Sequence, residues 1–246
     1  MNENYKFSIS CKVNSHDTDS AGNVRPSVMM RYIHEAANLQ FESGHPTLDE
    51  LRYNQHMVFI LCKVSMHIYR PLHSYENIDI VTWANDSSAA SFYRSGQIFV
   101  GGELSAELIS VWALVDTESR RLYRSKEVSI GIATSPEMPD ITQPAHIKMP
   151  ENAKFRFAGE REVYNSDTDI NGHMNNTNYP DMLCNFIPGI RESMVRSFRI
   201  NYLREAKFGE RFRVYIADSP EGHYMRTVKS DGTTGAEALI VTEELV

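Results

Sequence analysis

One polar loop brings together side chains that could act on a carbonyl group. Asp169, Asn171 and His173 are spaced two residues apart, and the amides Asn175 and Asn176 follow directly before an apolar helical pattern. A carboxylate and an imidazole can transfer protons, and histidine does so near neutral pH. The free backbone N–H groups at a helix start favour an oxygen that becomes negative in acyl transfer. The spacing therefore indicates acyl-transfer or acyl-hydrolysis chemistry.

Two other interpretations of this loop compete with acyl chemistry, namely a calcium site and a purely structural turn. The run Asp-x-Asp-x-Asn-Gly from Asp167 matches the opening of a calcium-binding EF-hand loop. However, Asn178 stands at position twelve, where a bidentate glutamate is required, and a strand rather than a helix precedes the loop. A turn followed by a helix cap accounts for the Asp and Asn residues but leaves His173 unexplained. The other histidines lack metal-ligand spacing with acidic or thiol groups, so we predict no metal and no cofactor.

The loop has an earlier copy in the chain, 150 residues upstream. The segments 13–24 and 163–174 share a valine, an Asp-Thr-Asp run and a glycine in register. An apolar helical face with the same phase follows each copy, and its members are Met29, Tyr32, Ile33, Ala36 and Ala37 in the first and Tyr179, Met182, Leu183, Phe186 and Ile187 in the second. The first copy has Ala21 and Asn23 in place of Asn171 and His173, which predicts that it is non-catalytic.

Each copy is embedded in the same order of predicted elements, namely strand, loop, helix and antiparallel meander. Alternating apolar patterns predict strands at 5–13, 58–69, 78–83, 91–100 and 104–115, and then at 155–157 with Val163, 195–203, 212–217, 224–228 and 238–242. An apolar helix face packed on a single-faced sheet gives an α+β fold. Prolines concentrate in residues 136–151, which we interpret as a linker between domains at 1–135 and 152–246.

Composition excludes several other classes of protein. The 246 residues are 23% charged and 41% hydrophobic, which is ordinary for a globular chain. A net charge of −7 argues against a general nucleic-acid binder. The longest apolar run is far shorter than a membrane helix, no secretory signal is visible, and three cysteines without CxxC spacing suit a reducing compartment. We therefore expect a cytoplasmic protein that binds neither membranes nor nucleic acid.

Two motifs resemble a known family. The run Asp169-Ile-Asn-Gly-His-Met-Asn-Asn-x-x-Tyr179 is similar to the Asp-x-Asn-x-His-x-Asn-Asn-x-x-Tyr signature of acyl-acyl-carrier-protein thioesterases. The later run Asn-Tyr-Leu-Arg-Glu205-Ala-Lys resembles that family's Glu-Tyr-Arg-Arg-Glu-Cys-Gly stretch. The resemblance implies two tandem hotdog domains, each a long helix wrapped by an antiparallel sheet. It also implies hydrolysis of fatty acyl-carrier-protein thioesters, which ends chain elongation in fatty-acid biosynthesis, without a cofactor.

The resemblance further implies roles for individual residues. The catalytic candidates are Asp169, Asn171, His173 and Glu205. The family position once assigned to a cysteine nucleophile is Ala206, so the attack must come from Asp169 or from an activated water. Cys184 is a rival nucleophile, although a free cysteine is more often a small buried hydrophobe.

Substrate contacts are expected from both copies. The predicted binding residues are Asn175 and Asn176, whose backbone N–H groups would face the carbonyl, with Met29, Met57 and Phe59 lining an acyl pocket in the first half. The same apolar residues could equally be ordinary core residues.

The partner is predicted from charge. Residues 190–213 contain seven arginines and lysines against three glutamates, which could steer an acidic acyl carrier protein or could form a solvated face with ordinary ion pairs. A homodimer is possible. The alternative functions are an acyl-coenzyme-A thioesterase, a hotdog hydratase or dehydratase, and a non-catalytic acyl-binding protein.

Overall fold

A computed structural model describes residues 5–244 and shows one continuous 11-stranded sheet. The strands are β1 (Phe7–Lys12), β2 (Met57–Ile68), β3 (Asn77–Asn85), β4 (Phe92–Val100), β5 (Glu103–Asp116), β6 (Thr134–Ser135), β7 (Arg156–Glu162), β8 (Ser193–Tyr202), β9 (Arg211–Ser219), β10 (Gly222–Lys229) and β11 (Thr234–Glu244). The order β1-β3-β4-β5-β2-β8-β11-β10-β9-β7 repeats one meander twice, since each half contributes one side of the sheet.

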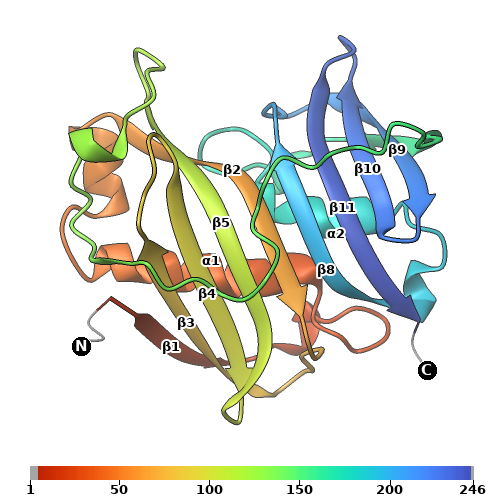
Figure 1. Cartoon of the computed structure of the whole chain (residues 1–246), viewed down its shortest axis with the longest axis horizontal. Helices are drawn as coiled ribbons and strands as arrows, with labels where there is room; N and C mark the ends of the chain where they lie inside the picture. Colours follow the sequence, from red (N-terminus) through yellow and green to blue (C-terminus); the bar gives the residue numbers. More distant parts are fainter. Residues whose placement is uncertain (1–4, 245–246) are drawn as a thin grey trace.

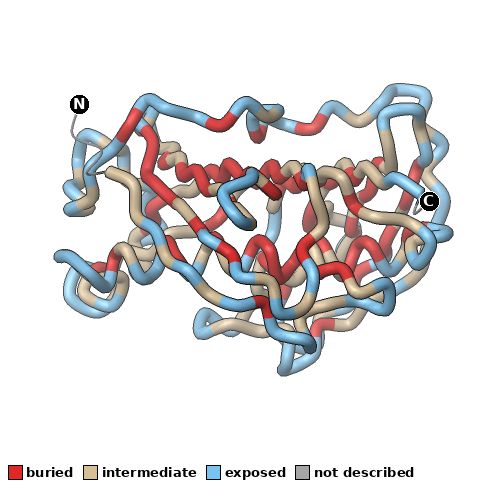
Figure 2. Tube along the Cα trace, turned by 90° about the horizontal axis from the view of Figure 1, so that it is seen from below, coloured by how far each residue is buried: buried red, intermediate tan, exposed pale blue. Residues whose placement is uncertain are grey.

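The two halves are joined edge to edge. Strands β2 and β8 pair antiparallel, with Lys63 opposite Asn201 and His67 opposite Ser197. Helices α1 (Pro26–Glu42) and α2 (Tyr179–Cys184) both lie behind the sheet in Figure 1. Buried residues gather in the interior, as Figure 2 shows. The prediction of tandem hotdog units in an α+β fold is therefore confirmed.

Helix α1 forms as its apolar spacing predicts. Pro26 occupies the first turn, where a missing N–H costs nothing, and the residues Met29, Ile33 and Ala36 are buried against the sheet. Gly96 on β4 lets the helix approach closely, because a Cβ at that position would collide with Ile33. The buried face of α1 thus packs against the sheet and forms the core of the first half.

The second helix is shorter than predicted. Helix α2 has 6 residues and follows a 3-10 turn at Asn176–Asn178. Proline and glycine at 188–189 stop any extension, and Gly189 adopts a left-handed φ of 72°. Ile187 lies beyond the helix and is still buried, so the apolar spacing identified core residues correctly even where the chain leaves the helix.

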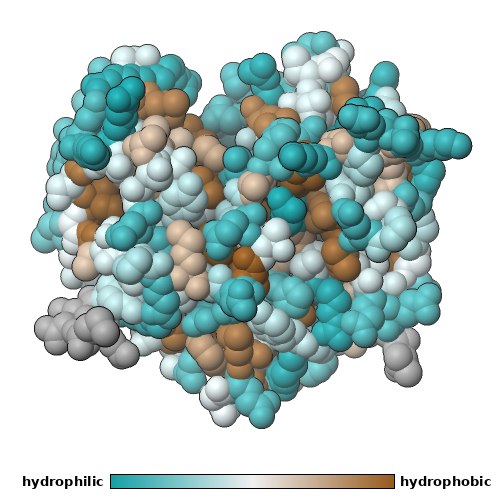
Figure 3. Space-filling view, in the orientation of Figure 1, coloured by the Kyte–Doolittle hydropathy of each residue, from teal (hydrophilic) through white to brown (hydrophobic). Residues whose placement is uncertain are grey.

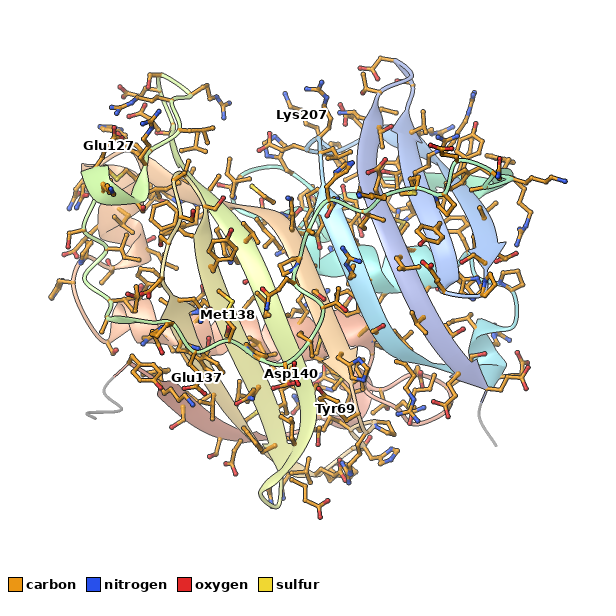
Figure 4. The ribbon with its side chains drawn as sticks, in the orientation of Figure 1. Tyr69, Glu127, Glu137, Met138, Asp140 and Lys207 are labelled. Atoms are coloured by element: carbon orange, nitrogen blue, oxygen red, sulfur yellow. The ribbon has the colours of Figure 1, made fainter. Side chains whose placement is uncertain are left out.

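The segment after β6 runs across the outer face of the sheet. Figures 1 and 4 show it passing in front of the strands from the first half to the second, with Glu137, Met138 and Asp140 along its course. The indole N–H of Trp83 donates to the Glu137 carbonyl at 2.8 Å. Ile147 is buried in a small apolar cluster on the second half. The linker interpretation suits this path, while the domain boundaries at 135 and 152 stay predictions.

The surface is mixed in character. Figure 3 shows small apolar patches separated by hydrophilic side chains, and a notch at the upper margin between the two halves. Within residues 5–244, none of the helices combines the length and apolarity needed to span a bilayer.

Candidate active site

A tight turn after β7 holds the predicted catalytic side chains together. The Asp169 N–H donates to the His173 carbonyl at 2.9 Å, and the Gly172 N–H donates to the Asp169 carbonyl at 2.9 Å. Gly172 has a φ of 74°, which glycine adopts without strain. The Asn171 N–H donates to Asp169 Oδ1 at 2.8 Å, and Asn171 Nδ2 donates to Asp169 Oδ2 at 3.4 Å. Asp169 and Asn171 therefore form one hydrogen-bonded unit.

The segment after β8 returns to this turn. The Met174 N–H donates to the Ala206 carbonyl at 2.7 Å, and an isolated antiparallel bridge links His173 to Lys207. These contacts place Glu205 Oε2 3.4 Å from His173 Nε2. The His173 side chain is 19% exposed and that of Glu205 is 46% exposed, so the pair can reach solvent water. Figure 4 shows Lys207 at the upper margin of the molecule.

One further residue was not predicted from the sequence. Arg52 lies in a π-helical turn, Glu50–Asn54, of the first half, and its Nη1 donates to Asn171 Oδ1 at 2.8 Å. This bond fixes the Asn171 amide with its oxygen toward Arg52 and its nitrogen toward Asp169. The site is thus assembled from both halves of the chain. In the sequence, only the positive charge of Arg52 indicates a role in the site, because the segment around it has no equivalent in the second half.

The two following amides hold the loop in place. Asn175 Oδ1 accepts the Thr177 N–H at 2.9 Å, which caps the 3-10 turn. Asn176 Nδ2 donates to the Leu61 carbonyl at 3.4 Å, beside the bulge in β2, and the Asn176 carbonyl accepts the Tyr202 hydroxyl at 2.9 Å. These bonds tie the loop to the central strands of both halves. The prediction for the Asn175 N–H is wrong, because this group donates to the Asp167 carbonyl at 2.8 Å. A carbonyl-binding role for the Asn176 N–H stays a prediction.

A pocket of about 190 Å³ opens beside Arg52 in the first half. Met57 and Phe59 line it, together with Arg52. The ring of Phe59 lies 5.8 Å from that of Phe41 and 5.5 Å from that of Phe92, so aromatic faces form much of the wall. Met29 does not belong to this pocket and lines a second cleft instead. Of the three predicted acyl-chain contacts, the structure brings two together.

The alternative nucleophile is poorly placed. Cys184 is buried, and desolvation raises the pKa of its thiol well above the usual range. Because the thiolate is the nucleophilic form, this cysteine has the character of a core residue.

The first copy repeats the same backbone bonds. The Asp19 N–H donates to the Asn23 carbonyl at 2.8 Å, and the Val24 N–H donates to the Leu72 carbonyl at 2.8 Å. Leu72 thus corresponds to Ala206, and its neighbour Pro71 corresponds to Glu205. The offset between the copies is 150 residues in the loop and 134 in the return segment, because the first half carries an insert. The first copy therefore has no counterpart of the Glu205 carboxylate or of the His173 imidazole.

Three of the seven cations in the predicted basic segment form ion pairs in the part of the chain that the structure describes. Arg211 and Arg213 of β9 pair with Glu162 and Glu160 on β7, and Arg196 pairs with Glu243. These contacts favour ordinary ion pairs for that part of the segment. Lys207, in contrast, lies beside His173.

The chain is a double-hotdog protein whose second loop gathers carboxylate, amide and imidazole groups. The model of the acyl-ACP thioesterase N-terminal domain matches residues 4–130, and that of the C-terminal domain matches residues 151–241. The chain belongs to the acyl-ACP thioesterase family and hydrolyses acyl-carrier-protein thioesters.

Solved structures share the complete fold. An acyl-ACP thioesterase from Bacteroides thetaiotaomicron is 19% identical with a TM-score of 0.85, covering 98% of this chain and 99% of its own. A 12:0-ACP thioesterase from Umbellularia californica is 16% identical with a TM-score of 0.80, covering 98% of each chain. No curated protein sequence matches this chain.

Proposed function

We propose that hydrolysis takes place at the His173–Glu205 pair, supported by the Asp169–Asn171 unit. The observation that carries the proposal is the 3.4 Å approach of Glu205 Oε2 to His173 Nε2 beside that unit. General acid–base groups must lie within reach of one another and of the reacting water. The half-exposed Glu205 carboxylate satisfies both requirements.

The reaction follows from these positions. Glu205 accepts a proton from water, and the water oxygen bonds to the thioester carbonyl carbon. The carbonyl oxygen becomes negative and is stabilised by the Asn176 N–H, with His173 balancing the charge. The C–S bond then breaks, and the departing sulfur takes the proton that Glu205 accepted from the water, which restores the Glu205 carboxylate. A thiol ionises at ~8.5, so this last step requires little assistance.

Water rather than Asp169 is the nucleophile in this mechanism. Both carboxylate oxygens of Asp169 accept hydrogen bonds from Asn171, at 2.8 and 3.4 Å. Such bonds stabilise the charge on the carboxylate and thereby weaken it as a nucleophile. Asp169 instead orients Asn171, whose amide is also held by Arg52 from the other half.

The acyl chain occupies the pocket beside Arg52. Met57 and Phe59 supply apolar surface there, and methionine adapts readily to a flexible chain. The product is a free fatty acid, whose release ends chain elongation.

An acyl carrier protein delivers the substrate and docks near Lys207. Two apolar side chains, Ile170 in the loop and Phe208 next to Lys207, are 74% and 65% exposed. A positive charge flanked by apolar groups suits an acidic partner with an apolar contact. A homodimer and a cytoplasmic location stay predictions from the sequence.

A comparison of matched substrates tests this function. Decanoyl-acyl-carrier-protein and decanoyl-coenzyme A are assayed for release of decanoic acid, with Glu205→Gln as the variant. We expect a higher kcat/KM for the carrier-protein ester and loss of both activities in the variant. Faster turnover of the coenzyme-A ester would assign the chain to a coenzyme-A substrate instead.

A further inference from the structure

A second cleft, of about 240 Å³, lies between the two halves at the first copy of the loop. Asp19, Asn23 and Pro71 line it. These three residues are the counterparts of Asp169, His173 and Glu205, as the repeated backbone bonds show. The cleft therefore occupies, in the first copy, the place that the candidate active site occupies in the second.

The replaced residues remove the counterparts of the His173–Glu205 pair from this cleft. Neither Asn23 nor Pro71 can transfer a proton, and Asp19 Oδ1 accepts the N–H groups of Ala21 and Asn23 at 2.9 and 3.0 Å. A ligand in this place would be bound and not hydrolysed.

The walls of the cleft are apolar. They come from both halves, with Met29 and Ile68 on one side and Cys184 and Val195 on the other. All four are buried, so the interior offers a dry surface to a hydrocarbon chain.

Four charged side chains line the cleft, two carboxylates and two guanidiniums, and Asp19 is already hydrogen-bonded to backbone N–H groups of its own loop. Asp181 accepts the Ser27 N–H at 2.9 Å and lies 3.5 Å from Arg25 Nε, so these two charges balance each other. Arg25 also donates to two loop carbonyls. Arg191 lines the cleft and is exposed, and no hydrogen bond or ion pair joins it to another residue between 5 and 244. It lies in the turn Ile190–Glu192 after α2, much as Arg52 lies in a turn after α1.

We propose that this cleft binds a fatty carboxylate, with the carboxylate on the Arg191 guanidinium and the chain against Met29 and Val195. A guanidinium favours a carboxylate over the uncharged carbonyl of a thioester. The site therefore binds the product of hydrolysis rather than the substrate. The proposal rests on the proposed function, because that reaction is what produces the fatty carboxylate.

Binding stoichiometry tests the proposal. Decanoate is titrated calorimetrically into the full chain, its Asn185→Trp variant and its Arg191→Gln variant, with Arg120→Gln as a matched surface control. Asn185 is exposed and lines the cleft, so tryptophan there obstructs it without touching the catalytic loop. Decanol, which lacks the charge, is titrated in parallel.

We expect two decanoate sites in the wild type and in Arg120→Gln, and one in Asn185→Trp with unchanged thioester hydrolysis. Arg191→Gln should weaken the second decanoate site about tenfold while leaving decanol binding unaltered. One site in every protein, or a second site that persists in both cleft variants, would overturn the proposal. Absence of thioester hydrolysis in the wild type would instead contradict the proposed function, so the two failures are distinguishable.

Discussion

The Arg52 guanidinium lies 2.8 Å from the Asn171 side-chain oxygen, and the two residues belong to opposite halves of the chain. This bond crosses the junction that β2 and β8 form by pairing. The first half thus contributes Arg52 to the candidate site, in addition to the pocket that we propose for the acyl chain. In the proposed mechanism Arg52 positions Asn171, so neither half holds the complete site.

Substitution of Arg52 tests this relationship. Arg52→Leu removes the bond to Asn171, so the amide can rotate and lose its contact with Asp169. We expect kcat to fall about tenfold, the effect of losing a charge-assisted hydrogen bond of ~1.5 kcal/mol or more, with a smaller change in KM. Arg52→Lys should recover part of the loss. The control Arg120→Gln should be normal, and a wild-type kcat in Arg52→Leu would refute the positioning role.

Isotope labelling distinguishes water from Asp169 as the nucleophile. In a single turnover with excess enzyme in H₂¹⁸O, attack by water places ¹⁸O in the first fatty acid released. Attack by Asp169 would instead transfer an unlabelled oxygen from the carboxylate. We expect the label in the first turnover, measured by mass spectrometry of the free acid. An unlabelled first product would assign the attack to Asp169 and reject the water mechanism.

Docking of the carrier protein should depend on salt. Raising ionic strength screens exposed charges, so kcat/KM with an acyl-carrier-protein substrate should fall steeply while a small thioester analogue changes little. Lys207→Gln should lower kcat/KM for the protein substrate a few-fold and flatten its salt response. An equal response of the two substrates would remove the steering role.

A half-buried histidine whose ring Nε2 is shielded from solvent predicts a pH-dependent stability. Burial, assisted by Arg94, lowers the pKa of His34 to about 4, and its Nε2 is shielded from solvent beside Trp112. The unfolded chain takes up this proton at ~6.5, so the free energy of unfolding decreases as the pH falls from about 6.5 to 4. We expect Tm to drop less between pH 7 and 5 in His34→Gln than in the wild type. Parallel Tm curves for the two proteins would show that His34 does not contribute.

The sequence predicted those features that depend on local spacing. Alternating apolar residues located the strands, and the two-residue spacing of Asp169, Asn171 and His173 placed their side chains on one turn. The approach of Glu205 was expected through the family resemblance, and the structure explains it by the bond from Met174 to Ala206.

Other features depend on contacts between distant segments and could not be predicted in this way. Arg52 lies in an insert of the first half, and its contact with Asn171 joins residues 119 positions apart in the chain. The correspondence of Pro71 with Glu205 is hidden because that insert changes the offset between the copies. The length of α2 was overestimated because the apolar spacing continues through Ile187, beyond the last helical residue.

Cooperation between His173 and Glu205 is the centre of the mechanism, and a double-mutant cycle measures it most directly. The variants His173→Ala, Glu205→Gln and their combination are assayed for kcat with decanoyl-acyl-carrier-protein. Each single substitution should reduce kcat by about 10²–10⁴-fold, and the double variant should be no slower than the slower single variant, since the pair acts as one unit. Losses that multiply in the double variant would contradict the account, because they would show that the two side chains act independently.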